Sequence, residues 1–488
     1  MSRTIPTVLL AALLASPLTA QAPFSALAVG PPLSVLAADS MGGRLVGTTG
    51  ARAAADYLAA RLRALGLTPA GDSGGYLQHI ALERRGISDS STVVLTAGTR
   101  QMTLGWGRTF AVEWGHPDSV ASYDAVWGDL TTRAGIDSTF KAAAGKFLVI
   151  DVPDGVGLLV QGFPATGRPA GIIALFSSAR FRVRALRMTL PPPVRVAGSV
   201  DPVHPPLVIV ADRDSISATL GTLAQGPAGT PAPFRISPRL TESVLSLDGW
   251  NVLATRAGAD VGRRGQFVMY TAQLDHVGRA DDRAGYCRTV AADSICNGAG
   301  AASGAVAELL VAERAAVAPA PHRSMIFAWL GAEEPGSLGL RWLLAHPPVP
   351  IDSILTAVGL GPVGRGGRDS IDVTGLREYA PDLVRVADSV ARAEPSPSAL
   401  IGRFERLDDP RRAYCRTPAA GLAVVGIPSI TLSGDRYPEF RRADDSVALV
   451  DADAVARAGR LAYDIGMAVG DGRPRLAVDS ALARSLCR

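Results

Sequence analysis

The feature that most constrains the fold is a regular alternation of apolar strand-like runs and helical stretches after Asn251. Strands are predicted at 266–272, 324–331, 354–358 and 429–432, and a helix is predicted at 305–316. Asp451 is expected to cap a last helix at its N-terminus. Such alternation is typical of a parallel sheet covered by helices on both faces. We therefore expect an α/β fold with a mixed, mainly parallel sheet sandwiched by helices.

A second pattern interrupts this one nearer the N-terminus. Between about residues 93 and 238, short β-type runs alternate with turns rich in Gly, Pro and Asp. The proline-rich stretch 190–206 is expected to be a loop. The pattern predicts an inserted β-rich domain and the following division: signal peptide 1–20, first part of the main domain 21–92, insert 93–245, and the rest of the main domain 246–488.

The N-terminus has the pattern of a secretory signal peptide. Arg3 precedes a short apolar run from Val8 to Ala15, and cleavage is expected after Ala20. The run is too short for an uncleaved anchor, because a membrane-spanning helix needs about 20 apolar residues. No later stretch is long enough either, so we expect a secreted or periplasmic protein with no membrane span in the mature chain.

Charge and cysteine content restrict the class further. The net charge of +4 is small for 488 residues, and the arginines are scattered rather than interleaved with aromatic residues, so no nucleic-acid surface is expected. Export permits disulfide bonds. Cys287 and Cys296 are close enough in sequence to close one loop, which leaves Cys415 and Cys487 as the other candidate pair. Four cysteines allow three connectivities, and the sequence does not choose among them.

Acidic residues follow two of the predicted strands directly. Asp275 comes after the strand at 266–272, and Glu333 and Glu334 come after the strand at 324–331. The carboxyl ends of parallel strands are where α/β enzymes place their active sites. A pair of carboxylates at such an edge indicates one general base and one metal ligand, as in hydrolases that activate water on zinc.

The motifs around these acids follow one another in a specific order. They are Gln273-Leu274-Asp275, the glycine- and alanine-rich run from Asn297 to Gly304, Gly331-Ala332-Glu333-Glu334, and Gly426-Ile427-Pro428. This order resembles that of the co-catalytic di-zinc aminopeptidases and carboxypeptidases of metallopeptidase family M28, and the inserted segment resembles a protease-associated domain. The resemblance implies the zinc-exopeptidase fold over most of the mature chain.

The resemblance also shows which functional positions are changed. It implies that Glu333 holds the general-base position, that Asp275 holds the position that orients a histidine ligand, and that Glu334 is the only retained zinc ligand. The other four ligand positions of the family carry Gln273, Gly300, Gly361 and Arg441. Independently of any alignment, no histidine follows His346.

These substitutions argue against a zinc site. Zinc generally needs three or four N, S or O donors, and a guanidinium both fails to coordinate and repels a cation. We therefore expect no cofactor, and we expect Arg441 to pair with Glu334 or Asp275 where the metal sits in the family. His276 does not replace a ligand in this interpretation, because strand alternation would point it away from Gln273 and Asp275.

The sequence thus predicts a secreted, family M28-like pseudoenzyme that binds a peptide or protein in the former cleft. The alternative is an active zinc-dependent exopeptidase, aminopeptidase-like, with Glu333 as base and Glu334 as zinc ligand. Two weaker patterns lack their structural context. Residues 359–364 match the dinucleotide fingerprint without a following helix signal, and residues 71–75 match a nucleophile elbow without a preceding buried strand.

Overall fold

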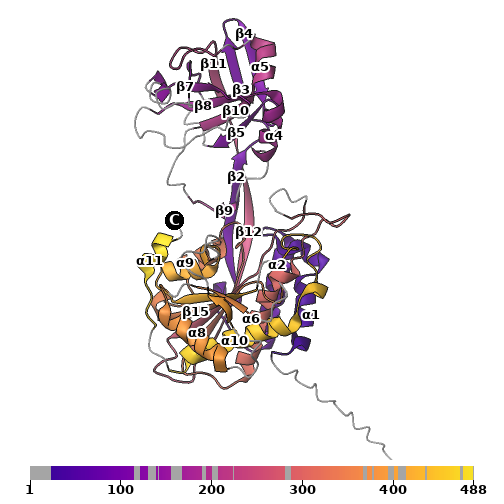
Figure 1. Ribbon diagram of the computed structural model, residues 1–488, viewed down its shortest axis with the longest axis vertical. Helices are drawn as coiled ribbons and strands as arrows, with labels where there is room; N and C mark the ends of the chain where they lie inside the picture. The colour runs from indigo at the N-terminus through magenta and orange to yellow at the C-terminus, as the bar shows by residue number, and fades with distance from the viewer. Residues whose placement is uncertain are drawn as a thin grey trace, which may run out of the picture.

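The computed structural model divides the chain into two lobes joined by a narrow ribbon of strands (Figure 1). The structure describes residues 24–486 except 115–120, 130–138, 141, 155–167, 189–193, 200–206, 222, 224, 281–286, 366–370, 376–377, 394–400, 405–413, 435–436 and 473–475. The expected signal peptide and Cys487 lie outside the described residues. Among the described residues, no helix combines the length and the apolar character that crossing a membrane requires.

The main lobe is built on a sheet of ten strands in the order β17-β16-β18-β15-β13-β14-β12-β2-β9, with β1 paired to β12. The central strands β14, β13, β15 and β18 are parallel, and β12, β2 and β9 continue the sheet in antiparallel pairs. The bounds are β1 Thr68–Pro69, β2 Leu77–Ile87, β9 Val194–Val196, β12 Glu242–Arg256, β13 Phe267–Gln273, β14 Ser324–Leu330, β15 Ile354–Leu360, β16 Ile371–Thr374, β17 Ile401–Phe404 and β18 Ser429–Ser433.

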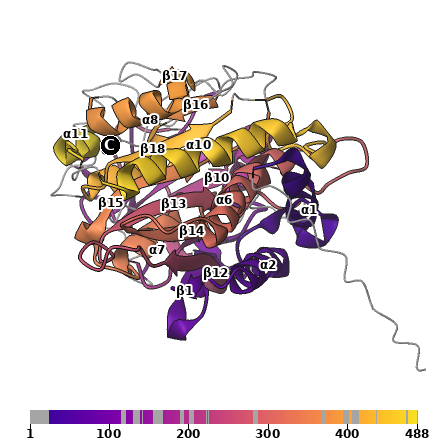
Figure 2. The same ribbon diagram turned by 90° about the horizontal axis from the view of Figure 1, so that it is seen from below.

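Helices cover both faces of this sheet, as the alternation predicts (Figure 2). Because β14 is buried on both sides, Phe327 and Trp329 pack on one face while Ile326 and Ala328 pack on the other. The first face is covered mainly by α1, α2, α6, α8 and α10, and the second by α7 and α9. The bounds are α1 Ala26–Leu36, α2 Thr49–Ala64, α6 Ala299–Val317, α7 Leu338–Ala345, α8 Pro381–Ala393, α9 Pro418–Val424, α10 Ala452–Gly470 and α11 Ser480–Leu486.

The inserted lobe, which comprises β3 to β11 without β9, has its own sheets and core. Its five-stranded sheet has the order β5-β10-β8-β7-β6, and a three-stranded sheet has the order β11-β3-β4. The bounds are β3 Thr92–Ala97, β4 Arg100–Gly105, β5 Phe110–Trp114, β6 Ala125–Trp127, β7 Phe147–Asp151, β8 Gly171–Phe176, α4 Ser178–Met188, β10 Leu207–Asp212, α5 Arg213–Leu220 and β11 Arg235–Arg239.

Three local expectations can be compared directly. Asp451 caps α10, since its side chain accepts a hydrogen bond from the Ala454 amide at 3.0 Å. Cys287 and Cys296 form a disulfide, while the expected Cys415–Cys487 pair stays a prediction. The expectation of a loop throughout 190–206 is wrong at Val194–Val196, because β9 pairs there with β2 and returns the chain to the main sheet.

Candidate functional site

The predicted site residues gather at the carboxyl edge of the parallel strands. β13 ends at Gln273, which is in register with Leu330 at the end of β14, and the Leu274 amide donates to the Leu330 carbonyl at 2.8 Å. Gly361 follows β15, and Gly300 lies in the first turn of α6, which starts at this edge. The sheet topology therefore brings the segments from distant parts of the chain together, as the sequence predicts.

Asp275 fixes the turn that carries the two glutamates. One carboxylate oxygen accepts a hydrogen bond from the Glu333 amide at 2.9 Å, and the other accepts from the Glu334 amide at 3.2 Å. The residue is 2% exposed, and its burial together with the nearby Glu334 charge raises the pKa of Asp275 well above its usual range. In this chain Asp275 organises the backbone that precedes α7.

Glu333 is turned toward the start of α7. One of its carboxylate oxygens accepts a hydrogen bond from the Leu340 amide at 2.9 Å, which satisfies one of the free N–H groups of the helix N-terminus. Burial raises the pKa of Glu333 to about 7. Such a value suits a general base near neutral pH, but one of its oxygens is engaged by the helix.

Glu334 is held between a histidine and an arginine. One carboxylate oxygen lies 3.1 Å from His276 Nδ1, and the other accepts a hydrogen bond from Arg441 Nη2. Burial alone would raise the pKa of Glu334, but the hydrogen bonds and charges of His276 and Arg441 outweigh it and lower that pKa. The carboxylate is therefore ionised, and both of its oxygens are engaged by side chains of the same protein. The expected Arg441–Glu334 pair is present.

The position of His276 differs from the sequence-based interpretation. Strand alternation would turn its ring away from Gln273 and Asp275, but β13 ends at Gln273, so the alternation does not extend to residue 276. The ring is fully buried and contacts Glu334 through Nδ1, while Nε2 has no hydrogen-bond partner among the described residues.

A buried ion pair fills the space beside Gly300. A Cβ atom added at Gly300 would lie 2.3 Å from the Tyr437 hydroxyl, so an aspartate cannot replace this glycine without moving Tyr437. Asp445, which is fully buried, accepts hydrogen bonds from the Gly300 amide at 3.2 Å, from Tyr437 at 3.0 Å and from Arg365 at 2.9 Å. Arg365 also pairs with Glu439.

A second buried arginine ties the N-terminal segment to the site. Arg44 is 1% exposed and donates to the carbonyls of Leu36, Leu274, Asn297 and Gly298. Burial lowers its pKa to about 10, against the opposing influence of the negative charges of Asp275, Asp445 and Glu334. The guanidinium remains charged at neutral pH and supplies a fixed positive charge close to three carboxylates.

The remaining substituted positions make backbone contacts. The Gln273 side-chain amide donates to the Asp275 carbonyl at 3.1 Å, and the Gly361 amide donates to the Leu432 carbonyl at 2.8 Å. Both residues serve the local backbone of the sheet edge. Among the described residues, no group of three or more His, Cys, Asp and Glu side chains is arranged to hold a metal ion.

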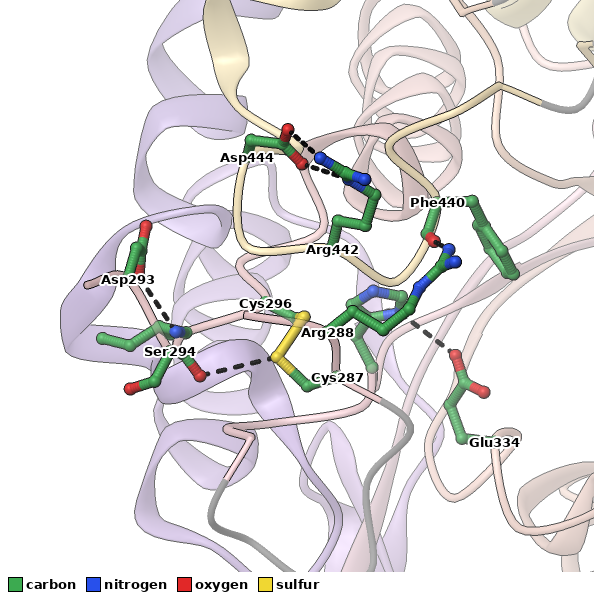
Figure 3. The surroundings of a disulfide bond; sticks show 11 residues. Cys287, Arg288, Asp293, Ser294, Cys296, Glu334, Phe440, Arg442 and Asp444 are labelled. Atoms are coloured by element: carbon green, nitrogen blue, oxygen red, sulfur yellow. Dashed lines mark hydrogen bonds and ion pairs between the residues drawn. A yellow bond between two sulfur atoms is a disulfide. The ribbon is translucent and has the colours of Figure 1, made fainter. Parts of the chain in front are cut away.

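A loop closed by the disulfide supports the segment that carries Arg441. The Arg288 amide donates to the Arg441 carbonyl at 2.9 Å, and the Ala443 amide donates to the Arg288 carbonyl at 3.0 Å. The Arg288 guanidinium also reaches the Phe440 carbonyl at 2.7 Å. Figure 3 shows the disulfide, Arg288 and Phe440 close together, with Glu334 beside this group.

Comparison with known proteins identifies the relationship. Residues 251–465, which include all of these site residues except Arg44, match the model of peptidase family M28. The chain resembles peptidase family M28. The resemblance that the motifs predict is thereby confirmed, and the matched segment contains the parallel strands and the whole edge that holds Asp275, Glu333 and Glu334.

Solved structures extend the likeness to both lobes. The aminopeptidase from Aneurinibacillus sp. strain AM-1 matches with a TM-score of 0.53 and 16% identity, covering 94% of this chain and 96% of that chain. The zinc aminopeptidase BSAP from Bacillus subtilis matches with a TM-score of 0.50 and 14% identity, covering 94% and 99%. No curated protein sequence matches the chain. At this identity the structural likeness establishes the shared mixed α/β fold.

The residues that complete the edge do not fit the two zinc ions of family M28. Among the five ligand positions that the family resemblance implies, only that of Glu334 carries a carboxylate, and its two oxygens contact His276 and Arg441. Tyr437 occupies the space that an aspartate side chain at position 300 would need. Arg44, Arg365, Asp445 and Tyr437 were not predicted from the sequence, because none of them belongs to a motif. Two of these residues are arginines. Because arginine is the usual basic residue of this chain, the sequence does not distinguish them from surface arginines.

Proposed function

We propose that this protein is an exported pseudoenzyme related to family M28 that binds peptide or protein segments at the former cleft without zinc-dependent hydrolysis. The observation that carries the proposal is the pairing of Arg441 with Glu334. A guanidinium is a permanent cation with no lone pair for a metal, so it competes with zinc for this carboxylate. The protein thus uses its own cations where the family uses metal ions.

Charge balance supports this proposal. The edge contains four partly or fully buried carboxylates, and uncompensated burial of such groups is costly. Arg44, Arg365 and Arg441 lie close to three of these acids, Asp275, Glu334 and Asp445, and supply compensating positive charge. Removal of metal ions from an otherwise unchanged site would leave these acids unpaired. The compensation is consistent with a stable edge that needs no zinc.

The surface next to Glu334 has the composition of a binding site. Phe440 is 37% exposed, and its ring lies 5.8 Å from the ring of Tyr437 and 6.3 Å from that of His276. The Arg441 side chain is 30% exposed beside it. Aromatic and arginine side chains are enriched among the residues that dominate binding energy at interfaces. We therefore assign Phe440 as the anchor of the peptide-binding surface.

One observation favours the alternative, an active zinc-dependent exopeptidase. The pKa of Glu333 near 7 matches a general base working at neutral pH. In this alternative Glu334 would leave Arg441 to bind zinc. Glu333→Gln would then abolish hydrolysis, whereas in the pseudoenzyme the same substitution leaves peptide affinity nearly unchanged.

Zinc content and hydrolysis separate the two functions. We expect purified mature protein from zinc-supplemented cultures to contain close to no zinc by elemental mass spectrometry and to leave leucine p-nitroanilide uncleaved. One or two zinc ions per chain, with hydrolysis that Glu333→Gln removes, would establish the alternative.

Binding is tested with a dye-labelled heptapeptide, Lys-Thr-Val-Thr-Val-Thr-Lys, by fluorescence anisotropy. Phe440→Ala should weaken binding by about tenfold or more, since truncating an aromatic anchor costs at least about 1–2 kcal/mol. Leu449→Ala, at an apolar residue that is 49% exposed and lies in a separate segment, serves as the matched control. Equal affinity of both variants and the unchanged protein would remove Phe440 from the site.

A further inference from the structure

The strand β12 has a long edge that is paired on one side only. Residues Glu242 to Val252 pair with β2, whereas β14 pairs with β12 only from Val252 to Arg256. Among the described residues, the edge of β12 from 242 to 251 therefore has no strand partner on the side of β14. This part of β12 belongs to the ribbon between the two lobes (Figure 1).

The direction of the free backbone groups follows from strand geometry. The Leu253 amide donates to the Tyr76 carbonyl, just before β2, at 2.7 Å. Because successive residues of a strand alternate in the direction of their N–H and C=O groups, odd-numbered residues of β12 face β2. Val244, Ser246 and Asp248 therefore present their N–H and C=O groups at the open edge.

The side chains on this segment are also available. Val244 is 50% exposed and Leu245 is 55% exposed, and as neighbours in a strand they lie on opposite faces of the ribbon. Natural proteins usually protect such an edge with proline, lysine, a bulge or a covering segment. An exposed edge with two aliphatic residues has the properties of a site for strand addition.

The position of the edge indicates its occupant. The open edge of β12 continues the line of β14, which ends at Leu330 and is followed by Glu333 and Glu334. A chain paired along this edge would run along the ribbon and meet the candidate site at its end. Since this edge belongs to the narrow ribbon of strands between the two lobes, an extended chain suits it better than a second globular body.

We propose that the open edge of β12 binds an extended peptide by strand addition, through the backbone groups of Val244, Ser246 and Asp248. This inference rests on the proposed function, because it specifies how the peptide reaches the former cleft. The peptide pairs antiparallel to β12, and β-branched side chains at neighbouring positions, which point to opposite faces of the strand, pack against Val244 and Leu245. Backbone pairing gives the affinity, and the surface at Phe440 receives the end of the peptide.

Ser246→Pro tests the inference, because proline removes an outward N–H group without removing a hydrogen bond to β2. We expect this variant to bind the labelled heptapeptide about tenfold more weakly, the loss of one backbone hydrogen bond at a pairing edge. Ser246→Ala keeps the N–H group and should bind normally. A heptapeptide N-methylated at both valines should also lose binding to the unchanged protein, which tests the pairing without altering the fold.

Hydrogen exchange locates the pairing directly. On addition of the heptapeptide, the amides of Val244, Ser246 and Asp248 should exchange more slowly, while those of Leu245 and Leu247, already directed to β2, should change little. Equal binding by Ser246→Pro, with no protection at these amides, overturns the inference while leaving the cleft proposal intact if Phe440→Ala still weakens binding. Absence of any heptapeptide binding overturns both.

A second copy of the chain is the competing occupant. If sedimentation velocity shows a concentration-dependent dimer that Ser246→Pro abolishes, the edge is an interface between copies and the peptide assignment is wrong. We expect the same sedimentation coefficient for the unchanged protein and the variant across the accessible concentrations.

Discussion

Glu308 is the clearest case of a single residue whose chemistry is set by burial. It lies within α6 with no exposed surface, and one carboxylate oxygen accepts a hydrogen bond from the Ala328 amide of β14 at 2.8 Å. The other oxygen has no hydrogen-bond partner among the described residues. Burial raises the pKa of Glu308 from 4.5 to about 8, so the folded protein holds this side chain protonated at neutral pH.

This burial predicts a pH-dependent stability. Because the pKa of Glu308 is higher in the folded than in the unfolded protein, its contribution to the free energy of unfolding is complete below about pH 4.5. That contribution is lost as the pH rises toward 8. Glu308→Gln imitates the protonated form and should remove this loss. We expect the free energy of unfolding of the variant, relative to that of the unchanged protein, to be at least about 1 kcal/mol higher at pH 8.5 than at pH 5. Urea unfolding at the two pH values measures this difference. An identical pH dependence in both proteins would show that Glu308 is ionised in the fold.

Asp445 carries a second prediction at this scale. It is fully buried and pairs with Arg365, which is itself 8% exposed, so Asp445→Ala leaves a buried guanidinium with less compensation. We expect a loss of about 3 kcal/mol in the free energy of unfolding. Asp56→Ala breaks an exposed pair with Arg52 and should cost less than about 0.5 kcal/mol. Comparable losses in the two variants would show that the buried pair does not stabilise the edge.

At the scale of elements, the disulfide loop and the loop after β18 form one unit. Arg288 and the segment from Phe440 to Ala443 exchange backbone hydrogen bonds, and the disulfide closes the loop that carries Arg288. The position of Arg441 opposite Glu334 therefore depends on a segment more than a hundred residues earlier in the chain. This connection lies outside every motif and follows only from the folded contacts.

Replacing both Cys287 and Cys296 with Ser should loosen this unit. Opening a loop of this length costs about 2.5 kcal/mol in the chain-entropy account of disulfide stabilisation. We expect faster hydrogen exchange at the amides of Arg288 and Ala443, which bond across the two loops. Asp293→Ala, which removes one turn contact to the Ile295 amide and keeps the disulfide, is the control. Unchanged exchange in the double variant would show that the loops are held together without the disulfide.

The sequence predicts the secondary-structure elements well where burial imposes a regular pattern of apolar residues. The apolar runs of β13, β14, β15 and β18 are found within a few residues of their expected bounds. It fails where local composition is ambiguous: α6 starts at Ala299, although its first turn contains Gly300 and glycine is a poor helix former. The start is favoured by the Asp445 side chain, which binds the Gly300 amide and comes from a distant segment. The contact of His276 with Glu334 is not predicted, because the end of β13 cannot be read from the sequence pattern.

At the scale of the whole molecule, the two lobes have separate hydrophobic cores. The inserted lobe packs one cluster around Ile173 and Leu175 and another around Ile172 and Phe176, on the two faces of its sheet. The main lobe has its largest cluster between its sheet and α6 and α10. The composition change near residues 93 and 238 predicts the insertion, but the return of β9 to the main sheet was not foreseen because three residues are too short for a periodic signal.

The last prediction concerns the independence of the main lobe. The Ser88 amide donates to the Thr241 carbonyl at 2.8 Å, so β2 and β12 are paired up to the point where the chain enters the inserted lobe. Replacing residues 89–240 with Asn-Gly, the preferred sequence of a two-residue hairpin turn, should join the strands without changing their register. The shortened chain also lacks β9, so Leu82 loses Val194 from its hydrophobic cluster and becomes partly exposed, at a cost below about 2 kcal/mol.

We expect the shortened chain to unfold in one cooperative calorimetric transition and to keep the near-ultraviolet circular dichroism of its buried aromatic residues. The full chain should show an additional transition from the inserted lobe, because that lobe has a core of its own. A broad transition without near-ultraviolet signal in the shortened chain would contradict the prediction. In that case the folding of the main lobe would depend on the inserted lobe through the ribbon. The open edge of β12 would then lie on a strand that is ordered only when both lobes are folded.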